Sequence, residues 1–104
     1  GNSFVHETES QVVLNGSYNI NFTMDLVLKD TGLFDDLAKK LGVPLEISPK
    51  VVEIFKDGQK KYGSRAWSSM IVKRMEDINK IDFRANGFPE ELTDNEPEEK
   101  GYEI

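Results

Sequence analysis

The amphipathic stretch 22–41 constrains the fold more than any other feature of this chain. Its apolar positions recur every three or four residues and so form one stripe along an α-helix. They are Met24, Val27, Leu28, Thr31, Phe34, Leu37, Ala38 and Leu41. Gly42 and Pro44 follow directly. Because glycine tolerates the left-handed position after a helix and proline cannot continue one, the pattern predicts a helix that ends at residue 41.

Two shorter helices flank this stretch. The sequence predicts one over residues 3–14, closed by the turn signal Asn15-Gly16-Ser17. Ser48 as N-cap and Pro49 at the first helical position begin the other, which runs to about Tyr62. Connections this short predict neighbouring helices that pack roughly antiparallel.

A fourth helix is predicted after Gly63, with Ser64 as its cap and its end at about Lys80. We also expect Gly32, in the middle of the long helix, to mark close packing against another helix, since glycine there otherwise costs about 1 kcal/mol relative to alanine. The sequence therefore predicts an all-α fold, a small bundle of about four helices.

Residues 81–104 break the helical pattern. Glycine and proline interrupt them repeatedly, and their apolar residues stand singly among charges. Residues 1–89 hold equal numbers of acidic and basic side chains, so the whole net charge of −6 lies in the last 15 residues. We expect a helical domain over 1–80 and an extended acidic arm over 81–104. The arm's aromatic residues are predicted to clasp a neighbouring subunit; they are Phe83, Phe88 and Tyr102.

Composition excludes several classes of protein. The chain has no cysteine, which excludes a disulfide scaffold and a thiolate zinc site. No apolar run approaches the roughly 20 residues that cross a bilayer, and the N-terminus lacks the pattern of a signal peptide. A neutral body with an acidic end does not favour nucleic acid or an anionic membrane. We expect a cytoplasmic protein, and the absence of an initiator methionine suggests a piece of a longer one.

Few residues indicate chemistry by themselves. His6 is the only histidine, and Asp35 and Asp36 are adjacent and so point to different parts of a helix surface. A lysine-rich face over residues 50–61 is interleaved with acids, which favours a solvated, salt-bridged surface. The adjacent Lys29 and Asp30 could bind a polar ligand or form a surface pair. The sequence predicts no catalytic residue and no metal site within this chain.

The region 15–46 resembles the second domain of the 3-hydroxyisobutyrate dehydrogenase family, the β-hydroxyacid dehydrogenases. The matching residues are a turn glycine, a phenylalanine before the helix, a Leu-x-x-Lys-Asp motif and a closing Leu-Gly-Val-Pro; they are Gly16, Phe22, Leu26, Lys29, Asp30, Leu41, Gly42, Val43 and Pro44. Ser3 and the helix from Val51 to Gly63 extend the resemblance to about residues 1–80.

The resemblance implies part of an NAD(P)-dependent 3-hydroxyacid dehydrogenase, an oxidoreductase that uses NAD or NADP on a small 3-hydroxyacid. It implies that Lys29, Asp30 and Phe22 lie at the cofactor and substrate cleft and that the helices assemble a homo-oligomer. The family's nucleotide-binding domain and catalytic lysine have no counterpart in this sequence. We therefore expect a fragment that is inactive alone.

A second hypothesis belongs to another class of protein. Three or four short helices with large apolar residues favour self-association when their partner helices are absent. The chain could therefore act as a helical dimerisation or interaction module without catalysis. The two hypotheses differ in whether Lys29 takes part in catalysis or is only a surface residue.

Overall fold

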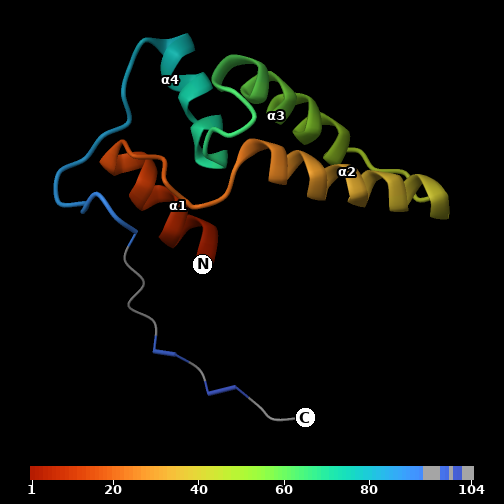
Figure 1. Ribbon diagram of the computed structural model, residues 1–104, viewed down its shortest axis with the longest axis horizontal. Helices are drawn as coiled ribbons and strands as arrows, with labels where there is room; N and C mark the ends of the chain where they lie inside the picture. Colours follow the sequence, from red (N-terminus) through yellow and green to blue (C-terminus); the bar gives the residue numbers. More distant parts are fainter. Residues whose placement is uncertain (93–96, 99, 102–104) are drawn as a thin grey trace.

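The computed structural model describes residues 1–92, 97, 98, 100 and 101. In this part of the chain helices form and no strand does, which confirms the all-α prediction (Figure 1). The elements in chain order are α1 (Phe4–Asn15), α2 (Met24–Leu41), α3 (Ser48–Tyr62), the short 3-10 helix η1 (Ser68–Ile71) and α4 (Lys73–Asn79). None of the described helices is long and apolar enough to cross a membrane.

Helices α2 and α3 pack side by side as a hairpin that extends away from α1 and α4 (Figure 1). Gly42 adopts the left-handed conformation, with φ of 69°, and its N–H bonds the last turn of α2, as predicted. The next helix starts differently from the prediction. Ile47 takes the N-cap position of α3, and the Ser48 hydroxyl donates to Asp35 Oδ1 of α2 at 2.5 Å instead of capping its own helix. That bond ties the two helices together.

A glycine allows the core to close, but it is not the one expected. Nothing lies within 4 Å of a Cβ placed on Gly32, so the predicted close packing there is wrong. Gly58 of α3 is buried instead. A Cβ on Gly58 would lie 2.9 Å from Ile71 Cδ1 and 3.2 Å from Met24 Cε. The missing side chain therefore lets the fully buried Met24 and the end of η1 reach the α3 backbone.

The predicted fourth helix begins later than Ser64. The chain after Gly63 forms a loop, then η1, and enters an α-helix only at Lys73. The prediction failed because the loop backbone bonds a different element: the carbonyls of Ser64 and Ala66 accept from the first amides of α2. Ser68 N, which would donate to Ser64 O in a helix that starts at Ser64, donates to Phe22 O instead.

Glu76 of α4 is the most deeply buried charged residue that the structure describes, with its side chain 1% exposed. Its Oε1 accepts a hydrogen bond from the Tyr18 hydroxyl at 2.6 Å and lies 3.3 Å from Arg84 Nη1. Burial and the hydrogen bond to Glu76 raise the pKa of Tyr18. A buried carboxylate needs such partners, because an unpaired charge is costly away from water. These three residues join the α1–α2 connection, α4 and the segment after α4.

Tyr18→Phe is expected to lower the free energy of unfolding by about 1–3 kcal/mol, because Glu76 loses a buried hydrogen-bond donor. Tyr62→Phe is the matched control. The Tyr62 hydroxyl donates to Asp77, which is far more exposed than Glu76, so we expect a clearly smaller loss. Urea unfolding followed by circular dichroism measures both. Equal losses in the two variants would contradict the role given to Glu76.

Candidate functional site

The loop after α3 holds the start of α2 through backbone hydrogen bonds. Thr23 and Trp67 form an isolated antiparallel bridge, and Ser68 N donates to Phe22 O at 2.7 Å. Met24 N donates to Ala66 O at 2.9 Å. These bonds fix the turn that carries Phe22 and, with it, the direction in which α2 leaves the core.

Asp25 strengthens this junction with its side chain. Its Oδ1 accepts from the Thr23 hydroxyl and from Leu26 N, and its Oδ2 lies 3.3 Å from Arg65 Nη1. The hydrogen bond from Thr23 and the interaction with Arg65 lower the pKa of Asp25 below its ordinary value of 3.8. Asp25 N donates to Ser64 O at 3.0 Å, so both its backbone and its carboxylate hold the loop.

Lys29 and Asp30 lie on the exposed surface of the first half of α2. Lys29 Nζ is 3.4 Å from Asp30 Oδ1, and the two side chains are 61% and 59% exposed. An ion pair this exposed contributes about 0–1 kcal/mol to stability. A ligand can therefore break the pair and bind either side chain at little cost. Lys29 follows Asp25 by four residues and therefore shares its side of the helix.

The three residues predicted at the cleft thus lie along one short region. Phe22 is half-buried in the turn before α2, and Lys29 and Asp30 follow within two helical turns. Lys29 can donate to an anionic or hydroxyl oxygen, and Asp30 can accept from a hydroxyl. The first amides of α2 are not a phosphate cradle, because Met24 and Asp25 already donate theirs to the loop. Lys29 and Asp30 can therefore bind a polar ligand at the surface of α2.

The other polar candidates form surface contacts. His6 is exposed and its Nδ1 lies 3.2 Å from the Ser10 hydroxyl, while Asp35 accepts from Ser48. Two lysines of the α3 face pair with acids one turn away, as the interleaved charges predicted. Among the described residues, no group of three or more His, Asp or Glu side chains comes together as metal ligands do.

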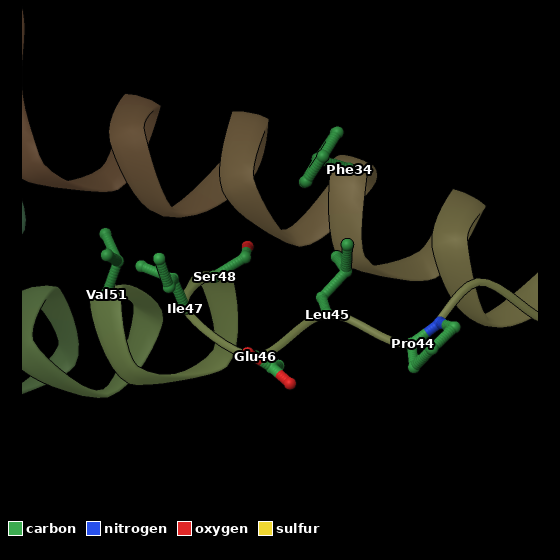
Figure 2. Close-up of a pocket in the computed structure, with 7 residues that line it drawn as sticks. All are labelled: Phe34, Pro44, Leu45, Glu46, Ile47, Ser48 and Val51. Carbon is green, nitrogen blue, oxygen red and sulfur yellow. The ribbon is translucent and has the colours of Figure 1, made fainter.

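A mainly apolar groove lies at the opposite end of α2 from Phe22. It has a volume of about 590 Å³, and none of Phe22, Lys29 and Asp30 lines it. Figure 2 shows Leu45 pointing toward α2, beside Phe34, while Glu46 points away. The groove lining is Phe34, Pro44, Leu45, Glu46, Ile47, Ser48 and Val51. The structure therefore separates the Lys29 region from this apolar end of the hairpin.

Comparison with known proteins identifies the family. Residues 1–75 match the sequence model described as "NAD-binding of NADP-dependent 3-hydroxyisobutyrate dehydrogenase". The chain belongs to this family, which confirms the resemblance seen in the sequence. The L-threonate dehydrogenases of Escherichia coli and Haemophilus influenzae are each 32% identical to it over 72 residues. That stretch is 68% of this chain but only 24% of each relative, so the chain spans about a quarter of their length. No solved structure matches the chain.

Thr23→Val is expected to raise the pKa of Asp25 toward 3.8, because the hydrogen bond from the Thr23 hydroxyl is the largest cause of its depression. A depressed carboxylate pKa stabilises the fold above the unfolded pKa, and that contribution is lost as the pH falls. Nuclear magnetic resonance titration of the Asp25 side chain measures the change. Thr31→Val is the control, since the Thr31 hydroxyl bonds Val27 O. An unchanged Asp25 titration in Thr23→Val would contradict the assignment.

Proposed function

We propose that this chain is the helical part of an NAD(P)-dependent 3-hydroxyacid dehydrogenase and forms one wall of its cofactor and substrate cleft. The proposed parent acts in the cytoplasm on a small 3-hydroxyacid, with NAD or NADP as hydride carrier. The chain alone is inactive, because no part of its sequence provides a dinucleotide-binding loop. Membership of a dehydrogenase family over residues 1–75 is the observation that carries the proposal.

The geometry of α2 supports the assignment of Lys29. Its ammonium is exposed and paired only with the equally exposed neighbour Asp30 among the contacts described. The loop after α3 holds the start of its helix through backbone hydrogen bonds, while the Lys29 side chain lies exposed. When the cofactor is bound, the hydride chemistry is the cofactor's own. Lys29 would hold an oxygen of the cofactor–substrate complex, and Asp30 would orient that lysine or accept a hydroxyl.

Lys29→Ala is expected to lower kcat/KM by about tenfold to a hundredfold, the cost of losing one charged hydrogen bond in the transition state. The assay uses Escherichia coli L-threonate dehydrogenase whose matching 72 residues are replaced by those of this chain. L-Threonate oxidation is followed with NAD and with NADP. Turnover by the chimera without further substitution shows that the chimera is folded. The circular dichroism spectrum of each variant shows that the variant is folded as well.

Lys39→Ala is the matched control for this experiment. Lys39 is an exposed lysine in the last turn of the same helix, so its loss removes the same charge at a distance from Lys29. We expect normal turnover from this variant. Equal activity of the Lys29→Ala and Lys39→Ala variants would contradict the proposed place of Lys29 in the cleft.

A second candidate function, self-association, is favoured by an exposed apolar stripe on α2. Leu33, Leu37 and Leu41 follow one another at intervals of four residues and are 63%, 55% and 66% exposed. Three large aliphatic side chains on one helix face indicate a surface that another protein covers. We propose that this stripe contributes to a homo-oligomer, which is compatible with the dehydrogenase proposal.

Leu37→Glu is expected to reduce the assembly of the chain to a monomer, because it places a charge at the centre of the stripe. Light scattering at several concentrations measures the mass. Gly32→Glu is the control, since the same charge there meets open space outside the stripe. A monomer in the unaltered chain at every concentration would exclude self-association through this surface.

A further inference from the structure

The segment that follows α4 lies outside the family match, which ends at residue 75. Residues 81–90, named the strap, leave α4 in an extended conformation and pass beside the end of α1 (Figure 1). Sequence patterns predicted an arm that grips a neighbouring subunit. The first part of this arm, the strap, contacts its own chain. Tyr102, one of the three aromatic residues predicted to clasp, lies outside the described residues.

One arginine carries most of the strap's side-chain contacts. Arg84 Nη2 donates to the Tyr18 hydroxyl at 2.8 Å, and its guanidinium carbon lies 5.1 Å from the centre of that ring. Nη1 reaches Val13 O at 3.2 Å and Glu76 Oε1 at 3.3 Å. A planar guanidinium can serve several acceptors at once, which a lysine ammonium cannot do with the same geometry. Arg84 thereby neutralises the buried Glu76 and fastens the strap to α1.

The space for Arg84 exists because residue 16 is a glycine. Gly16 closes α1 with φ of 83°, a conformation that side chains other than glycine seldom adopt. A Cβ at this position would lie 2.6 Å from Arg84 Nε. The glycine that ends α1 therefore also leaves the space that the guanidinium of Arg84 occupies.

Hydrogen bonds to the strap backbone continue beyond the arginine. Ala85 N donates to Leu14 O at 3.1 Å, which satisfies a carbonyl in the last turn of α1. Asn15 Nδ2 donates to Pro89 O at 2.6 Å. The strap is thus bound at two successive places along the end of α1.

We propose that the strap is a separable intramolecular lock, closed by Arg84, that seals the junction of α1 and α4. It supplies a counter-charge to Glu76 and covers the last carbonyls of α1. Phe83 of the strap also forms one wall of a mainly apolar groove of about 480 Å³ along α1. Opening the strap would therefore expose the Glu76 carboxylate and remove that wall in one step.

Amide hydrogen exchange in the 104-residue chain tests the lock, with Ala85 as the reporter because its N–H bonds Leu14 O. We expect Ala85 to be protected, and equally so at every protein concentration. Arg84→Ala should accelerate its exchange about tenfold or more while the amides of α2 and α3 keep theirs. Arg65→Ala is the control, since Arg65 is an exposed arginine far from the strap in sequence.

Gly16→Ala supplies a second variant in which Arg84 is intact. Its Cβ would lie 2.6 Å from Arg84 Nε and so displace that side chain, and we expect Ala85 to exchange faster than in the unaltered chain. Gly42→Ala imposes a similar backbone strain, with φ of 69° and open space around the Cβ, and should leave Ala85 unchanged.

Several results would overturn the proposal. They are an unprotected Ala85 in the unaltered chain, an unchanged Ala85 in Arg84→Ala, and loss of protection throughout α2 and α3 in that variant. Protection that falls on dilution would also overturn it, because the strap would then be exchanged between two copies. None of these results bears on Lys29, so the dehydrogenase proposal is tested separately.

Discussion

The backbone pairing between the start of α2 and the loop after α3 is the constraint on which the rest of the structure depends. The loop carbonyls use the first amides of α2, and the Phe22 carbonyl accepts from the loop in return. This pairing closes the hairpin of α2 and α3 at its inner end and holds Met24 against Gly58 in the core. It also fixes the backbone of the one helix that presents Lys29 to solvent. The backbone at the start of the candidate site is therefore held by hydrogen bonds, and the side chains of Lys29 and Asp30 lie exposed on the helix surface.

Sequence signals that act within a few residues predicted the ends of the helices well. Gly42 and Gly63 end α2 and α3 as their sequence context predicted, since a glycine with positive φ, here 69° and 98°, terminates a helix whatever lies around it. The same reasoning failed at Ser64, where a capping signal was present but the backbone bonds another element. It also failed at Gly32, because helical periodicity gives no means of telling a glycine in a helix contact from one in open space. Both failures concern contacts between segments distant in sequence.

The cluster around the buried Glu76 could be predicted from the sequence even less. Tyr18, Glu76 and Arg84 are separated by up to 66 positions, and no motif links them. Glu76 lies in a short helix among other charged residues, so nothing in its neighbourhood distinguishes a carboxylate that is 1% exposed from a solvated one. Lys29 and Asp30 differ, because a Leu-x-x-Lys-Asp motif that resembles the family's marks them in the sequence itself. In the structure both side chains are exposed.

The most direct test of the account is a crystal structure of the chimeric L-threonate dehydrogenase, carrying this chain's residues, with reduced cofactor bound. The account predicts that Lys29 Nζ leaves Asp30 and lies within hydrogen-bonding distance of an oxygen of the cofactor or of a bound substrate analogue, with Phe22 along the same wall. A bound cofactor that is remote from α2, with the Lys29–Asp30 pair still in solvent, would contradict it. In that case the chain's place in the family would stand, and its contribution would lie in assembly.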